Sequence, residues 1–266
     1  MHNQIYILYY IKTKDVKKNN MTEFIRYLSC GKIGDFIFQL SIINENFLNT
    51  GKKGILFISS EYESFLYGVE KAYNDTKCMI MSQQYIADYK IHTGEAYDIN
   101  LCSWRGSRLL YKSNFANIFN DLYGVKWGKN KWITANNNPI FNGKTLFSCS
   151  TVVNRFPQNI NYYKLLKHLN ISMEDVFFIS QNKEEYDNFV NKTDIRFKLY
   201  IAATFDDFIC AMNSCSCYIG NMSSPLTISI ALHKRTVALL SNCLDRPHVL
   251  GLETIIPELT NITEFN

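Results

Sequence analysis

Residues 29–35 read Ser29-Cys30-Gly31-Lys32-Ile33-Gly34-Asp35 and separate two apolar patterns of different period. The run before them, residues 24–28, has the length and composition of a buried strand. After them, apolar residues recur at helical spacing, at Phe36, Leu40, Ile43 and Phe47. The two glycines therefore predict a tight turn from a strand into a helix, where free backbone N–H groups can hold an anion.

Asp35 falls in the first turn of this predicted helix. In a doubly wound sheet, ligands bind in the crevice beyond the carboxyl ends of the strands. We therefore expect the chemistry of the protein at this turn. By position alone the Asp35 carboxylate has a second interpretation, in which it only complements the positive end of the helix dipole.

Composition bounds the class of protein. The chain has 266 residues, of which 47% are hydrophobic and 14% aromatic, as expected for a folded protein with one large or two ordinary domains. The net charge of +4 comes without a Lys/Arg block, so we expect no nucleic-acid partner. No apolar run approaches the roughly 20 residues of a spanning helix, and no secretion signal is recognisable.

The eight cysteines form no CxxC pair. In a chain of this size such scattered cysteines predict reduced core thiols, and with them a cytoplasmic location. Cys215 and Cys217 share one face of a strand, but a metal site would need further ligands near them in the fold, and we expect no metal site.

Strand and helix patterns alternate from residue 23 onward, as in a parallel, doubly wound α/β fold. Residues 1–20 do not fit this pattern, and we interpret them as an extension, disordered or upstream of the true start. The strands expected in the first half are residues 24–28, 54–58, 77–81 and 97–101, with helices after the first turn and over 62–72 and 106–123. The strands expected in the second half are residues 145–149, 176–179, 197–201, 217–219 and 236–240, with helices over 161–169, 183–191, 206–212 and 225–232.

A polar segment around Asn136-Asn137-Asn138-Pro139 is the best domain boundary. It predicts two Rossmann-like domains that face a central cleft, over residues 21–138 and 139–266.

The second domain carries a similar turn, Ile219-Gly220-Asn221-Met222-Ser223-Ser224-Pro225. Ser224 is a plausible N-cap, and Pro225 suits the first helical position because its missing N–H costs nothing there. The helix that follows is apolar on most sides, which predicts burial. Hydroxyl and free N–H groups at its N-terminus are suited to bind phosphate. A capped core helix without a ligand would have the same sequence pattern.

Three motifs resemble those of the heptosyltransferase-like family, glycosyltransferase family 9. The turn at Gly31 and Gly34-Asp35 is similar to the amino-terminal signature, in which a GD pair follows the first strand. Residues 218–227, running on to 231–232 and 236–239, are similar to the carboxy-terminal signature. Between them, Arg155-Phe156-Pro157 resembles a loop in which a basic residue precedes an aromatic-Pro pair.

This resemblance implies a GT-B fold and an inverting, metal-independent transfer of a hexosyl or heptosyl group, without a cofactor. The donor would be a nucleotide-diphosphate sugar bound by domain 139–266, and a glycan or lipid-linked acceptor would bind domain 21–138. Asp35 matches the family's general base, which takes the proton of the acceptor hydroxyl. The implied donor-binding residues are Arg155, Asn221, Ser223, Ser224 and Thr227.

The second signature departs from the family at two positions. Met222 stands where an acidic residue is usual, and Thr227 where a histidine is usual. These departures keep open a different class of function, a non-catalytic nucleotide- or glycan-binding protein on the same scaffold. A Rossmann oxidoreductase is disfavoured because the first turn lacks GxGxxG.

For several single residues the sequence allows both a functional and a structural role. Arg155 either neutralises a leaving diphosphate or is a solvated surface arginine. The aromatic Trp104, beside Arg105, and Trp127 either face an acceptor sugar or pack in the core or at its rim. His233, at a helix end, is expected to be a dipole partner and not a catalyst.

Overall fold

The computed structural model describes residues 23–263 and 265, apart from 128–129 and 152–153. The predicted extension over residues 1–20 lies outside the described residues. Two parallel sheets with interleaved helices give the α/β class that the sequence predicts. In the part of the chain that is described, no helix has the length and apolar character needed to cross a membrane.

The first sheet has the strand order β3-β2-β1-β4 and is parallel throughout. Its strands are β1 (Phe24–Ser29), β2 (Lys53–Ile58), β3 (Ile86–Ile91) and β4 (Ile99–Asn100). Its helices are α1 (Ile33–Thr50), α2 (Val69–Met81) and α3 (Phe115–Tyr123), and the 3-10 helix η1 (Leu101–Gly106) follows β4.

The second sheet has the order β10-β9-β8-β5-β6-β7 and is likewise parallel. Its strands are β5 (Thr145–Ser148), β6 (Val176–Ser180), β7 (Lys198–Ile201), β8 (Cys217–Asn221), β9 (Arg235–Leu239) and β10 (Leu259–Ile262). Its helices are α4 (Tyr162–His168), α5 (Lys183–Thr193), α6 (Phe205–Ser214) and α7 (Ser224–Ala231). Short 3-10 helices complete it: η2 (Pro139–Phe141), η3 (Met173–Asp175), η4 (Arg246–His248) and η5 (Leu252–Thr254).

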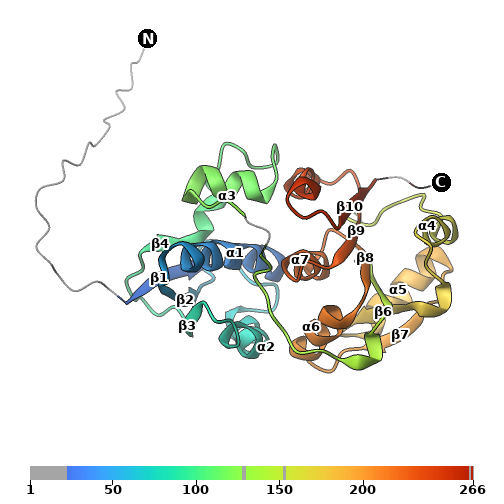
Figure 1. The fold of residues 1–266 in the computed structure, drawn as a ribbon, viewed down its shortest axis with the longest axis horizontal. Helices are drawn as coiled ribbons and strands as arrows, with labels where there is room; N and C mark the ends of the chain where they lie inside the picture. The colour runs from blue at the N-terminus through green and yellow to red at the C-terminus, as the bar shows by residue number, and fades with distance from the viewer. Residues whose placement is uncertain (1–22, 128–129, 152–153, 264, 266) are drawn as a thin grey trace, which may run out of the picture.

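Helices α1 and α7 pack against each other between the two sheets, as Figure 1 shows. Every residue of α1 from Phe36 to Glu45 is buried, and so is every residue of α7 from Leu226 to Ala231. One hydrophobic core therefore continues from the first sheet to the second. A second cluster lies under α4 and α5, on the opposite face of the second sheet. The boundary at 138/139 stays a prediction.

Three expected elements of the first half are wrong. Residues 77–81 are the end of helix α2 and not a strand, because Ala72, Thr76, Met79 and Ile80 bury one helical face. The helix expected over 62–72 begins only at Val69. The helix expected over 106–123 begins at Phe115, where the Asn114 side chain accepts a hydrogen bond from the Asn117 N–H and caps it.

Two strands were not expected, β3 and β10. Both lie at sheet edges and carry polar residues, Asp88 and Lys90 in β3, Thr260 and Asn261 in β10. A strand at the edge of a sheet has a neighbouring strand on one side only and tolerates such residues. Its apolar pattern is therefore too weak to be recognised in the sequence.

The expected cap of α7 needs a smaller correction. Ser223 is the N-cap residue and makes no side-chain capping bond, whereas Ser224 is the first helical residue and Pro225 the second. Proline is tolerated there because the first N–H groups of a helix have no partner within it.

The expectation that all cysteines are reduced is wrong for one pair. A disulfide joins Cys30 to Cys102, whose Cα atoms are 5.7 Å apart, and six other cysteines are free. The cytoplasmic location therefore stays a prediction.

Candidate functional site

The two turns singled out in the sequence meet at the centre of the molecule. They follow β1 and β8 and open helices α1 and α7. A Cβ atom built on Gly34 would lie 3.2 Å from Thr227 Oγ1 and 3.6 Å from Ser224 Cα. The start of α1 therefore touches the start of α7, and glycine at position 34 allows this close approach.

Gly31 makes room for a charged side chain from a distant segment. Its φ of +104° is strained for other residues, and a Cβ atom there would lie 2.8 Å from Arg105 Nη2. Arg105 comes from η1, which the disulfide between Cys30 and Cys102 holds beside the turn.

The Asp35 carboxylate lies in the first turn of α1 and is about one-quarter exposed, at 27%. Its Oδ2 accepts a hydrogen bond of 2.8 Å from Arg105 Nη2. The same guanidinium nitrogen also contacts Glu63 Oε2. Asp35 is thus a partly exposed carboxylate held by the Arg105 guanidinium at the positive end of helix α1.

Arg155 reaches the second turn from the loop after β5. Its Nη2 donates a hydrogen bond of 2.8 Å to Asp245 Oδ2, and both side chains are about 30% exposed, at 30% and 31%. This partial exposure leaves the guanidinium within reach of a bound anion. Arg155 is therefore neither a solvated surface residue nor a buried structural one.

Asn221 positions that loop. It is fully buried, and its amide accepts from the Ser150 N–H at 2.9 Å and donates to the carbonyls of Ser150 and Arg155, each at 2.8 Å. With its polar atoms so engaged, Asn221 fixes the backbone that carries Arg155.

The hydroxyl residues of the second turn differ in exposure. Ser223 is partly exposed and donates to the Asn221 carbonyl at 3.1 Å, and Ser224 is also partly exposed. Thr227 is only 5% exposed and faces Gly34. Ser223 and Ser224 are thus accessible to a ligand, whereas Thr227 mainly fills the contact between the helices.

Sequence reasoning missed three polar residues around the site: Glu63, Asp245 and His248. His248, from η4 of the second half, stacks on Tyr111 at 5.3 Å and accepts a hydrogen bond of 3.3 Å from the Tyr111 N–H. It also contacts the Trp104 ring, at 5.8 Å between centroids. Burial lowers the pKa of His248 below its ordinary value. None of these residues lies in a motif. In the sequence, only the neighbouring Trp104-Arg105 pair pointed to this side of the site.

The two tryptophans considered as contacts for an acceptor sugar instead pack in the protein interior. Trp104 is 4% exposed, and Trp127 stacks on Phe38 of α1 at 5.8 Å. Both rings therefore pack against the hydrophobic core, Trp104 within it and Trp127 at its edge.

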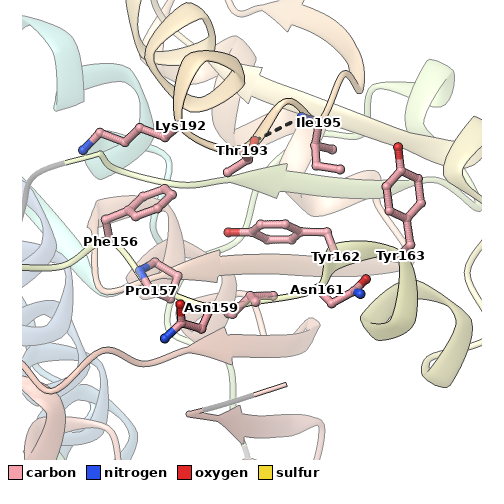
Figure 2. A pocket seen from close by; sticks show the side chains of 10 residues that line it. Phe156, Pro157, Asn159, Asn161, Tyr162, Tyr163, Lys192, Thr193 and Ile195 are labelled. Carbon is pink, nitrogen blue, oxygen red and sulfur yellow. Dashed lines mark hydrogen bonds between the residues drawn. The ribbon is translucent and has the colours of Figure 1, made fainter. Parts of the chain in front are cut away.

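A separate hollow of about 580 Å³ lies beside α4 and the end of α5, on the face of the second sheet opposite to α7. Figure 2 shows its aromatic and amide lining, with Phe156, Tyr162, Asn159 and Asn161. The hollow begins one residue after Arg155 but does not include the two turns. Among the described residues, no group of three His, Cys, Asp or Glu side chains is placed to hold a metal ion.

Comparison with known proteins identifies the fold. No protein-family profile and no curated protein sequence matches the chain. Among solved structures, E. coli heptosyltransferase WaaC with ADP is similar with a TM-score of 0.60 and 8% identity, over 89% of this chain and 92% of that one. E. coli ADP-heptose lps heptosyltransferase II is similar with a TM-score of 0.55 and 11% identity, over 90% of each chain.

A glycosyl transferase family 9 structure from Veillonella parvula has a TM-score of 0.51 and 14% identity, over 84% of this chain and 83% of that one. At these identities the likeness concerns the fold. The chain therefore has the two-sheet GT-B fold of the heptosyltransferases, as the sequence motifs predicted.

Proposed function

We propose that this chain is an inverting, metal-independent glycosyltransferase that moves a sugar from a nucleotide-diphosphate donor to a glycan or lipid-linked acceptor. The observation that carries the proposal is the meeting of the two turns, which brings the Asp35 side of the site next to the Ser223-Ser224 side. The solved neighbours with the same fold include a heptosyltransferase with bound ADP, which supports a nucleotide donor here.

In the proposed reaction, Asp35 takes the proton of an acceptor hydroxyl as its oxygen attacks the anomeric carbon. The bond from that carbon to the donor phosphate breaks, and the diphosphate leaves with both electrons. Arg155 and the first N–H groups of α7 stabilise the negative charge on the diphosphate. Because Arg155 now binds Asp245, the donor phosphate would replace the Asp245 carboxylate on the guanidinium.

A binding protein without turnover remains the second candidate. Met222, where the resemblance expects an acidic residue, is 9% exposed, and the buried Thr227 replaces the expected histidine. Two polar donor contacts of the family are thus absent from this turn.

The deciding experiment measures binding and turnover together. A thermal-shift panel of ADP, UDP, GDP and their sugars, with ADP-heptose included, should show one series that raises the melting temperature, because a ligand of the native state stabilises it. Release of the nucleoside diphosphate is then followed with a panel of glycan acceptors. Binding with turnover supports the transferase. Binding alone across the panel supports the binding protein, and no shift with any nucleotide contradicts both the transferase and a nucleotide-binding protein.

A further inference from the structure

The Arg105 guanidinium is the most constrained charged group beside the site. One nitrogen, Nη2, contacts the carboxylates of both Asp35 and Glu63. Its central carbon lies 4.3 Å from the centroid of the Trp104 ring, in a cation–π contact. The planar group is thus fixed on one face by an aromatic ring and at one corner by two acids.

The Trp104 ring is itself immobilised. It packs edge-on against Phe115 at 5.1 Å and against His248 at 5.8 Å, and it is buried. Because Phe115 belongs to the first half and His248 to the second, elements of both halves hold the platform under Arg105.

Stability alone explains this arrangement poorly. Arg105 Nη1 is buried and has no hydrogen-bond partner among the described residues, and neither has Trp104 Nε1. Buried donors without acceptors destabilise a folded protein, most of all when the donor is charged. A glycine is also needed at position 31 to admit the guanidinium, because a Cβ atom there would meet Arg105. Such local costs are typical of functional sites.

We propose that Arg105 is a positioning residue for Asp35, and that it holds the carboxylate in the orientation that receives the acceptor proton. Glu63 holds the same guanidinium nitrogen, so that Arg105 does not follow Asp35 when the acceptor binds. This inference rests on the glycosyltransferase function proposed above. It adds that a second-half element, η4, fixes the orientation of a first-half base through Trp104.

The test compares Arg105→Gln and Arg105→Lys with Arg108→Gln as the matched control. Arg108 lies on the same segment, pairs with Asp121 at 3.0 Å, and its side chain is 81% exposed. We expect Arg105→Gln to lower kcat by about 10²-fold, the loss typical of a reacting group misplaced by ~1 Å. Arg105→Lys keeps the charge but loses the planar fork, so it should recover part of kcat. The Kd for ADP should stay within about twofold in all three, because the proposed phosphate site lies at Arg155 and not at Arg105.

A double variant separates positioning from simple destabilisation. If Arg105 acts through Asp35, the double variant Asp35→Asn/Arg105→Gln should have the same kcat as Asp35→Asn alone. Two multiplying losses, or a kcat for Arg105→Gln within twofold of the wild type, would overturn the proposal.

A crystal structure of Arg105→Gln gives a readout that does not depend on turnover. We expect the Asp35 carboxylate to leave its present orientation while α1 stays in place. An unmoved carboxylate would overturn the positioning role even if the wild type transfers no sugar. A displaced carboxylate in an inactive wild type would support the positioning role while contradicting the transferase.

Discussion

Arg155 and Asp245 form an ion pair of 2.8 Å between two distant segments of the second half. The pair joins the loop after β5 to the segment just before η4, and both side chains remain about one-third exposed. The arginine on which the proposed donor site depends is therefore already neutralised by a carboxylate of the chain itself.

Replacement of Arg155 by alanine should weaken the binding of ADP by about 1.5–3 kcal/mol, the value of a charge-assisted hydrogen bond to an anion. Isothermal titration with ADP measures this loss. Arg246→Ala serves as the control, since Arg246 bonds to Asn242 on the same side of the molecule. An unchanged affinity for ADP would move the phosphate site away from Arg155.

The Asp245→Asn change should act in the opposite direction. It removes the carboxylate that competes with phosphate for Arg155 but keeps a similar shape, so ADP should bind several-fold more tightly, by roughly 0.5–1 kcal/mol. Isothermal titration with ADP measures this gain. The titration is repeated at high salt, because salt screens the attraction between exposed charges such as Arg155 and Asp245. Weaker binding would mean that Asp245 helps to orient Arg155 and does not compete with the ligand.

Asp35→Asn should lower turnover by about 10²–10⁴-fold and leave ADP affinity nearly unchanged, because the base acts on the acceptor. If Asp35 only complements the helix dipole, the variant loses under about 1 kcal/mol of stability and keeps its turnover. Sugar transfer and melting temperature measured side by side distinguish the two roles.

Gly31→Ala should destabilise the protein more than Gly51→Ala does. Both glycines have positive φ, +104° and +73°, but a Cβ at residue 51 meets no atom within 4 Å, whereas one at residue 31 meets Arg105. Gly51→Ala therefore reports the backbone strain, about 1 kcal/mol. An equal loss of unfolding free energy in both variants would show that Arg105 yields easily to the new methyl group.

Acid should destabilise the packing of η4 through His248. Burial keeps the pKa of His248 below its ordinary value of 6.5 in the folded state, so the unfolded chain binds the proton more readily. The neutral imidazole therefore stabilises the fold above about pH 6.5, and this contribution is lost as the pH falls from there toward the folded pKa. His248→Gln keeps an acceptor for the Tyr111 N–H but does not titrate.

Melting temperatures at pH 7.5 and 5.5 measure this effect. We expect the wild type to lose more on acidification than His248→Gln. Equal losses would assign the acid sensitivity to other groups.

The sequence was most informative where apolar period and turn chemistry agree. The strand, glycine turn and helix at residues 24–50 form as predicted, and α7 is buried from Leu226 to Ala231, as its mostly apolar sequence predicts. The elements placed wrongly lie between residues 62 and 114, where Gly68 and the positive φ of Tyr111 mark turns that local pattern did not reveal. Edge strands β3 and β10 were missed for lack of alternation.

For the candidate site, too, the sequence reveals local motifs but not contacts between distant segments. Asp35 and Arg155 are proposed as site residues from motifs, because each follows a strand at a short distance. Their partners Arg105 and Asp245 are 70 and 90 residues away in the sequence, respectively, and only the folded chain brings each pair together. The direct contact of Gly34 with Thr227 likewise depends on how the two sheets meet, which no single motif encodes.

The segment between the sheets has a mechanical consequence. Trp132 Nε1 donates a hydrogen bond of 3.0 Å to the carbonyl of Ile37 in α1, and the Trp132 N–H donates one of 3.1 Å to the carbonyl of Ala231 in α7. A connection that is bonded to both central helices cannot serve as a free hinge. Any closure of one half on the other must therefore slide α1 along α7 in a small shear movement, or break these bonds first.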